Sequence, residues 1–232
     1  MCGIVGFSGK IEYKREIVQN MMDLIVHRGP NSAGAYTDAD MALGFRRLSI
    51  IDVSDAGTQP LYSADGNLAL LFNGEIYNYK TIRQALIEKG YQFATQTDSE
   101  VLIYGYQEYG TALLQKLRGM FSFVIWNKIE KTLFGARDFF GIKPLYYALM
   151  GDTFMFGSEI KAFLAHPDFK KELNESALEN YLTFQYSPTE ETFFKNVYKL
   201  SAAHCFKYSN GKLTTKRYWD IHFNADETPD LD

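Results

Sequence analysis

Cysteine, long apolar runs and clustered basic residues are all scarce in this sequence. Its two cysteines, Cys2 and Cys205, and its four histidines do not stand at the spacings that zinc sites favour. We therefore expect neither a disulfide framework nor a bound metal. No stretch approaches the ~18 apolar residues that a membrane helix requires, and no basic lead precedes the short apolar run at the start, as it would in a secretory signal. These absences predict a cytoplasmic chain that does not contact a membrane.

The charge balance argues against a second class of protein. The chain has 24 Lys and Arg residues against 28 Asp and Glu residues and no basic cluster, so it does not suit a protein that holds nucleic-acid phosphates. Its 46% hydrophobic content is enough to bury one sizeable core. We expect one domain over residues 1–220, followed by a polar, acidic linker or tail over residues 221–232.

Short apolar runs rich in β-branched and aromatic residues predict a protein built on strands. Several runs are apolar almost without alternation, which favours sheets stacked in layers and covered on both faces. Helical periodicity indicates helices near residues 17–25, 82–87, 101–105 and 174–182. An Asn-Gly pair at 210–211 predicts a hairpin over residues 203–219. The other expected strands cover residues 3–7, 33–37, 41–45, 68–73, 121–126, 133–137, 145–149 and 153–156.

Cys2 has the most distinctive chemistry. Its small side chain allows an aminopeptidase to remove Met1, which would leave Cys2 with a free α-amine beside its own thiol. The reference pKa values are about 8 for the amine and about 8.5 for the thiol, so at neutral pH one residue would carry a nucleophile and a partly unprotonated base. The alternative from position alone is that Cys2 is a small apolar residue at the start of a buried strand.

Eight motifs favour the chemical interpretation. They run in order from residue 2 to about residue 220 and resemble the class II glutamine amidotransferases, most of all the glutaminase half of glutamine-hydrolysing asparagine synthetase. The resemblance implies an α+β fold, a four-layer αββα sandwich of two antiparallel sheets (the N-terminal-nucleophile hydrolase fold). It also implies that glutamine is hydrolysed to glutamate and ammonia through a Cys2 thioester. The motifs lie at residues 1–7, 27–30, 47–52, 59–61, 73–78, 97–100, 119–121 and 137–147.

The resemblance implies an oxyanion hole at Asn73 and Gly74. The side-chain amide of Asn73 and the backbone N–H of Gly74 would join Cys2 as the catalytic groups, since a glycine lets the backbone approach the tetrahedral oxygen closely. Glu75 would help to hold the α-amino end of the substrate. By itself an Asn-Gly pair is more typical of a turn.

The same resemblance assigns Arg47, Ile51 and Asp98 to the substrate. Arg46 and Arg47 are adjacent on an expected strand and should point to opposite faces, and the motif selects Arg47 to grip the α-carboxylate. The backbone near Ile51 would line the same pocket. Asp98 would face the α-ammonium of glutamine, although its position also suits an N-cap for the following helix.

Several further residues are expected to act as supports. His27 and Arg28 are interpreted as residues behind the site, and Asn31 replaces the family's usual Asp, which leaves a charge role there open. The motif that begins at Arg137 and Asp138 is interpreted as structural. Beside Cys205 stands His204, but adjacent side chains on a strand diverge, so core packing is favoured over a dyad.

The expected ligand is L-glutamine, and the expected partner is a synthetase domain or subunit that receives ammonia. We find no nucleotide-binding loop in the sequence, so no cofactor is expected here, and ATP and Mg are expected only for the synthetase part. A homodimer is left open. The alternatives are a glutaminase that serves another acceptor, and a non-catalytic glutamine-binding module if Met1 is retained.

Overall fold

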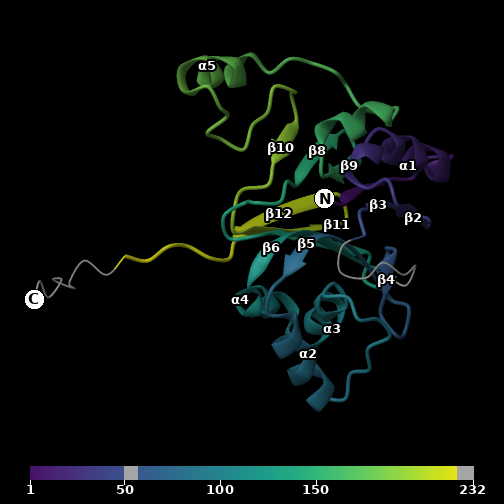
Figure 1. Cartoon of the computed structure of the whole chain (residues 1–232). Helices are drawn as coiled ribbons and strands as arrows, with labels where there is room; N and C mark the ends of the chain where they lie inside the picture. Colours follow the sequence, from purple (N-terminus) through teal and green to yellow (C-terminus); the bar gives the residue numbers. More distant parts are fainter. Residues whose placement is uncertain (50–56, 224–232) are drawn as a thin grey trace, which may run out of the picture.

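The computed structural model describes residues 1–49 and 57–223, and its centre is a pair of stacked antiparallel sheets (Figure 1). The strand order is β10-β8-β9-β1-β3-β2 in the first sheet and β12-β11-β7-β6-β5-β4 in the second. The first sheet contains β1 (Gly3–Ser8), β2 (Ser32–Thr37), β3 (Met41–Arg47), β8 (Tyr146–Met150), β9 (Thr153–Gly157) and β10 (Val197–Lys199). The second contains β4 (Leu61–Tyr62), β5 (Leu68–Ile76), β6 (Gly119–Asn127), β7 (Thr132–Arg137), β11 (His204–Ser209) and β12 (Lys212–Arg217).

Helices cover the two outer faces of the sheets. One layer is α1 (Lys14–Asp23) with the 3₁₀ helices η1 (Val26–Arg28) and η4 (Ile160–Ala165), beside the first sheet. The other is α2 (Tyr79–Glu88), α3 (Glu100–Tyr109), η3 (Gly110–Ala112) and α4 (Leu113–Lys116), below the second sheet in Figure 1. The expected four-layer αββα sandwich is therefore confirmed.

Three apolar cores lie between these four layers. Because successive strand residues point to opposite faces, each apolar run divides between two cores. On β1, Ile4 packs between the sheets, whereas Val5 and Phe7 pack toward α1. On β5, Leu71 packs between the sheets, whereas Phe72 packs toward α2 and α3. The near absence of alternation in these runs thus reflects strands covered on both faces.

Most expected elements form, with differences at their ends. The first helix ends earlier than its apolar periodicity predicts, because α1 stops at Asp23 and the chain then forms the 3₁₀ helix η1. The hairpin between β11 and β12 turns at Asn210 (φ 51°) and Gly211 (φ 74°), as expected for its Asn-Gly pair. Short elements such as β4 and β10 were not expected.

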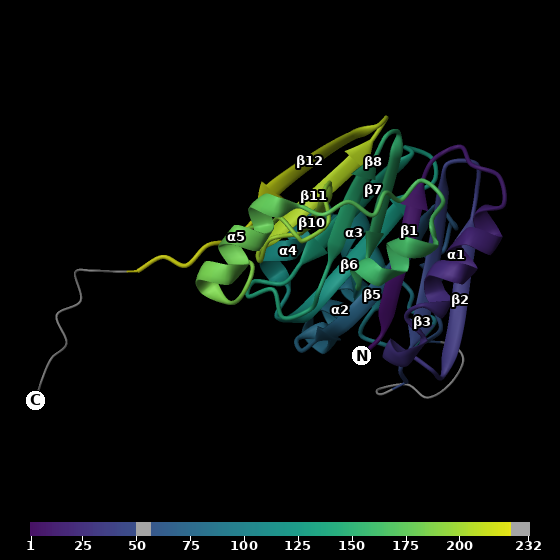
Figure 2. The ribbon, with the colours of Figure 1, turned by 90° about the horizontal axis from the view of Figure 1, so that it is seen from above.

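The fourth expected helix is α5 (Glu175–Phe184), which stands at the margin of the layers, away from β1, β2 and β3 (Figure 2). Only Ala177 of this helix is buried. Across the described residues, no helix has the length and apolar character needed to cross a membrane.

Candidate active site

Most of the predicted site residues meet in one cavity of about 180 Å³. It lies where β1 begins and where β3 ends, beside the last residues of β5. Ile51 lies outside the described residues. The predicted residues that line the cavity are Cys2, Arg47, Asn73, Gly74, Glu75 and Asp98.

The thiol of Cys2 is held by the segment after β3. Its Sγ accepts a hydrogen bond from the Leu48 N–H at 3.4 Å and lies 3.6 Å from the Leu48 carbonyl oxygen, to which the S–H can donate. Burial raises the pKa of the Cys2 thiol, and the Leu48 hydrogen bond, Arg47 and Arg28 oppose that shift only in part. The thiol therefore needs a base at neutral pH.

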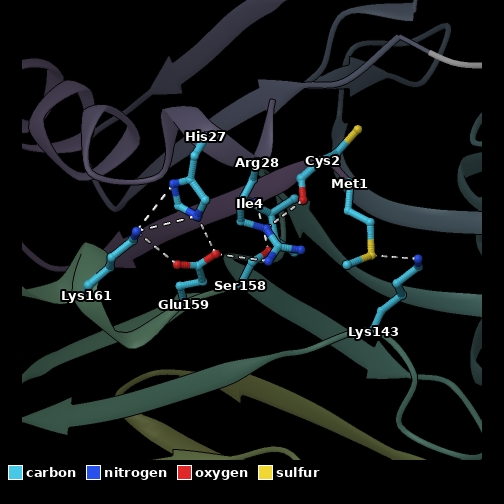
Figure 3. A network of polar contacts seen from close by, with 9 residues as sticks. All are labelled: Met1, Cys2, Ile4, His27, Arg28, Lys143, Ser158, Glu159 and Lys161. Carbon is cyan, nitrogen blue, oxygen red and sulfur yellow. Dashed lines mark hydrogen bonds and ion pairs between the residues drawn. The ribbon is translucent and has the colours of Figure 1, made fainter. Parts of the chain in front are cut away.

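Met1 precedes Cys2 and also lines the cavity. Burial lowers the pKa of its α-amine, an effect strengthened by the nearby charges of Arg28 and Lys143. Its thioether Sδ accepts a hydrogen bond from Lys143 Nζ at 2.9 Å (Figure 3). The start of the chain thus lies in a partly buried, positively charged environment.

Near its end, β5 has no paired strand within the described part of the chain on the edge that faces away from β6, and two of its backbone N–H groups bind side chains there instead. The Phe72 N–H donates to Gln59 Oε1 at 2.6 Å, and the Ile76 N–H donates to Asp98 Oδ2 at 2.8 Å. Because N–H directions alternate along a strand, the N–H of Gly74 points to this same edge, between the two. Gly74 lines the cavity, so its N–H is available to an oxygen bound there.

Asn73 supplies a second donor to the cavity. It is only 1% exposed, and its Nδ2 is buried without a hydrogen-bond partner among the described residues. Buried donors are nearly always paired, so an unpaired one at a cavity wall indicates a partner that arrives with a ligand. Gly74 beside it has no room for a side chain, because a Cβ there would collide with the Met120 carbonyl oxygen on β6.

The two neighbouring arginines of β3 point to opposite faces, as expected. Arg46 pairs with Asp23 and donates to the Met22 carbonyl oxygen on the α1 side. Arg47 is buried at the cavity, with its guanidinium against Gly57, where a Cβ would collide with it. Of these two arginines, only Arg47 can therefore contact a ligand in this cavity.

Asp98 faces the cavity and is not the cap of α3. Its carboxylate binds the Ile76 N–H of β5, whereas α3 begins at Glu100 after Ser99, with no side-chain cap hydrogen bond. The N-cap interpretation is therefore not supported. Burial raises the pKa of Asp98 to about 6, and the nearby charge of Glu75 acts in the same direction. A cation bound beside Asp98 would restore its ionised form.

A cluster of charged side chains around Glu159 holds the backbone of Cys2 in place (Figure 3). Arg28 Nε donates to the Cys2 carbonyl oxygen at 3.0 Å, and Arg28 NH1 pairs with Glu159 Oε1 at 3.0 Å. His27 Nε2 lies 2.8 Å from the same carboxylate oxygen, and Lys161 Nζ lies 3.3 Å from the other. Burial alone would raise the pKa of Glu159, but the hydrogen bonds from Arg28, His27 and Lys161 lower it. His27 and Arg28 thus stand where the sequence predicts support.

Glu159 is one of the supporting residues that the sequence does not identify. It follows β9, more than a hundred residues from Arg28, and belongs to none of the motifs. A single carboxylate after an apolar strand is usually a solvated surface charge, so its only available signal was its place at the end of a buried strand.

The motif at Arg137 and Asp138 is structural, as expected, but the loop it fixes reaches the active site. Arg137 donates to the carbonyl oxygens of Gly141, Lys143 and Leu200 at 2.6 to 2.7 Å. The Asp138 carboxylate accepts backbone N–H groups from the same loop, including that of Lys143 at 3.0 Å. The loop places the side chain of Lys143 in the cavity wall, which sequence reasoning did not predict.

Asn31 performs its supporting role without charge. Its Oδ1 accepts the Ser49 N–H at 3.1 Å, and its own N–H donates to the Arg47 carbonyl oxygen at 3.0 Å. A neutral amide is sufficient here, because the group it binds is a backbone donor.

Cys205 belongs to the core, as predicted. It is buried between the second sheet and its helices, and its Sγ lies 3.5 Å from the Lys216 carbonyl oxygen, while the His204 ring donates to the Ala202 carbonyl oxygen instead. Both cysteines are free. Among residues 1–49 and 57–223, no cluster of His, Cys, Asp and Glu side chains could hold a metal ion.

Comparison with known proteins identifies the family of this chain. A family described as the glutamine amidotransferase domain matches residues 1–219, so the chain belongs to the glutamine amidotransferases. Within that class it is similar to glutamine-hydrolysing asparagine synthetases of Bacillus subtilis. Asparagine synthetase 1 is 43% identical over 98% of this chain and 37% of its own length, and asparagine synthetase 3 is 35% identical over 95% and 37%. The chain thus spans little more than a third of these relatives.

Solved structures support the fold. The chain superimposes on a structure titled as the allosteric regulatory enzyme of purine biosynthesis with a TM-score of 0.72 at 21% identity, covering 93% of this chain and 49% of that one. The glutamine phosphoribosylpyrophosphate amidotransferase of Bacillus subtilis gives a TM-score of 0.70 at 21% identity, with the same coverage. At this level of identity the likeness shows the shared fold alone.

Proposed function

We propose that this chain hydrolyses the side-chain amide of L-glutamine with Cys2 as nucleophile and, once Met1 is removed, the α-amine of Cys2 as base. One observation carries the proposal. A single cavity holds a thiol, the unpaired amide nitrogen of Asn73 and the outward N–H of Gly74, which together match the needs of attack on a carbonyl. Such a set has no evident use in a purely structural cavity.

The first half of the reaction follows from these groups. The α-amine takes the thiol proton while Sγ bonds to the amide carbon, and the carbonyl oxygen becomes an oxyanion held by Asn73 Nδ2 and Gly74 N–H. When the intermediate collapses, the C–N bond breaks and the protonated amine gives its proton to the leaving nitrogen. Ammonia departs, and a thioester remains on Cys2.

The second half regenerates the enzyme. A water molecule loses a proton to the α-amine and attacks the thioester, the same donors hold the new oxyanion, and the C–S bond breaks. Glutamate leaves, and the proton returns to the thiolate. Arg47 binds the α-carboxylate of the substrate, and Asp98 with Glu75 binds its α-ammonium, so the two charged ends place the amide beside Sγ.

We further propose that the ammonia serves asparagine synthesis by an ATP-dependent synthetase domain or subunit. The names of the relatives and the limited share of their length that this chain covers support this acceptor. ATP and Mg would belong to that other part. The apolar surface of α5 and its flanks offers a contact for such a partner, because Leu178, Leu182, Phe184 and Tyr186 are exposed.

A different acceptor is the second candidate. A protein named amidase chyE of Penicillium rubens is 32% identical over 96% of this chain, so the same domain occurs in proteins not named as synthetases. The alternative in which the chain only binds glutamine requires that Met1 be retained, since a peptide bond at Cys2 N would remove the base.

A glutaminase assay on protein of known N-terminal mass tests the proposal. Chain that begins at Cys2 should release glutamate and ammonia in equal amounts from glutamine. Chain with Met1 retained by an uncleavable extension should bind glutamine but turn it over only at background rate. Failure of the processed chain to release ammonia would contradict the proposed function, and full activity of the extended chain would assign the base to another group.

A further inference from the structure

Lys143 is a buried cation that the mechanism above does not use. Its side chain is only 5% exposed, lines the cavity, and has the thioether of Met1 as its hydrogen-bond partner (Figure 3). Within residues 1–49 and 57–223 it forms no ion pair. A buried ammonium without a carboxylate is costly, so a lysine held in this way indicates a task within the cavity.

The backbone of Lys143 is fixed on both sides. Its N–H donates to Asp138 Oδ2 at 3.0 Å, and its carbonyl oxygen accepts Arg137 Nε at 2.7 Å. Both of these partners are themselves buried. The backbone of this loop is therefore held rigidly, and it directs the Lys143 ammonium toward Met1.

A second cation lies on the other side of Cys2. Arg28 Nε binds the Cys2 carbonyl oxygen, and its own charge is balanced by Glu159, which lies behind the site. Among the described residues Lys143 has no such ion-pair partner. Burial and the charge of Arg28 lower the pKa of the Lys143 ammonium, and the charges of Asp138 and Glu75 oppose that shift only in part. Arg28 and Lys143 both lower the pKa of the α-amine that now belongs to Met1.

Removal of Met1 brings the new α-amine onto Cys2. It then lies one bond from the Cα that bears the carbonyl held by Arg28, while Lys143 loses its thioether partner. A positive charge near an amine disfavours its protonation, so the two cations oppose addition of a proton to the group that must act as base.

We propose that Lys143 is a positioning residue whose buried ammonium keeps the α-amine of processed Cys2 unprotonated, and therefore available to accept a proton, at neutral pH. This inference rests on the proposed glutaminase function. It gives the loop fixed by Arg137 and Asp138 a direct bearing on the proposed chemistry, since this loop sets the position of the Lys143 charge.

Titration of the amine itself tests the proposal without relying on activity. Processed protein is labelled with ¹³Cα and ¹³Cβ cysteine, which gives signals from two residues, and the core residue Cys205 serves as the reference. The Cα shift of Cys2 follows the amine and the Cβ shift follows the thiol. In Lys143→Met the amine should titrate roughly half to one pH unit higher than in the wild type.

Matched variants separate charge from shape. Lys143→Arg keeps the charge and should titrate like the wild type, and Lys143→Gln provides a second uncharged side chain should the methionine variant be unstable. Lys131→Met removes the same charge at the opposite end of the sandwich, where Lys131 pairs with Asp40, and should leave the titration unchanged. The rising limb of kcat/KM against pH should move upward only in the two uncharged Lys143 variants.

Two results would overturn the proposal. One is an amine that titrates at the same pH in folded Lys143→Met as in the wild type. The other is a steep rise in KM with an unmoved titration, which would assign Lys143 to the substrate carboxylate instead. Absence of glutamine turnover in the wild type would reject the proposed function while the titration of the amine still decides the role of Lys143.

Discussion

The two ends of the sandwich differ in the state of their polar groups. The larger cavity, about 950 Å³, lies at the end of β1 that contains Ser8, and several of the polar side chains that line it are paired. Lys131 pairs with Asp40 at 2.9 Å, and Thr153 donates to Asp168 at 2.7 Å. The smaller cavity, at the start of β1, holds the unpaired amide nitrogen of Asn73 and the ammonium of Lys143, whose hydrogen-bond partner is a thioether and not a carboxylate. The unpaired buried donor of Asn73, rather than cavity volume, distinguishes the end where we propose that glutamine is hydrolysed.

The sharpest way to break this comparison is to replace each of the two cysteines. Cys2→Ala should abolish glutamine hydrolysis, a loss on the order of 10⁴-fold or more, because no other thiol lines the small cavity. Cys205→Ala should keep most of the activity, since that thiol packs in the core. Ammonia release measured for both variants checks the prediction, and surviving turnover in Cys2→Ala would refute the covalent mechanism.

Removal of the unpaired amide should have the next largest effect. Asn73→Ala is expected to lower kcat by roughly 10² to 10³-fold with little change in KM, because the amide binds charge that develops only during reaction. Asp152→Asn, at the wall of the larger cavity, is the control and should stay within about twofold of the wild type. A change confined to KM in Asn73→Ala would point to ground-state binding instead.

The arginine pair on β3 compares the two faces of one strand. Arg47→Ala should weaken glutamine binding by roughly 2 to 5 kcal/mol, because the α-carboxylate loses its partner in a buried site. Arg46→Ala should matter far less, since Arg46 faces α1 and pairs with Asp23. Steady-state KM values measure the difference, and equal effects from the two variants would contradict the assignment.

The smallest expected effect is the change of glutamine affinity with pH. The pKa of Asp98 is raised to about 6 in the free protein, so its carboxylate gains a proton as the pH falls through that value and can no longer attract an α-ammonium. Glutamine affinity should therefore fall about tenfold per pH unit below this point. Calorimetric titration of the inactive Cys2→Ala protein measures this without turnover. Asp98→Asn should bind weakly at every pH, and an unchanged pH dependence in that variant would remove Asp98 from the substrate contact.

Much of the fold could be predicted because buried positions recur at the period of a strand or a helix, and apolar residues occupy them. The runs around Leu71 and Phe123 are apolar on both faces, and they become inner strands of stacked sheets. The short strands β4 and β10 leave no such trace, because two or three residues cannot show a period. The limit at residue 220 stays a prediction, although β12 ends at Arg217 and Trp219 packs on Phe139.

The site was predictable only as far as its motifs. Arg47, Asn73 and Asp98 come from short sequence patterns, and the structure brings all three to one cavity. Glu159 and Lys143 could not be assigned in the same way, since the direction of a loop side chain depends on tertiary contacts far away in the sequence. For Asp98 the local pattern was misleading, because the carboxylate accepts the Ile76 N–H at the edge of β5 and does not cap the helix.

The position of β1 also sets an order of events during synthesis. β1 pairs with β3 on one side, but its other neighbour, β9, and the loop that holds Lys143 are made much later. At ~5–20 residues per second, the interval between the synthesis of Arg47 and that of Lys143 lasts on the order of ten seconds. Until the end of this interval the nascent N-terminus lacks the part of the cavity wall that Lys143 supplies. We therefore expect an aminopeptidase that removes Met1 to act before the wall that contains Lys143 is in place.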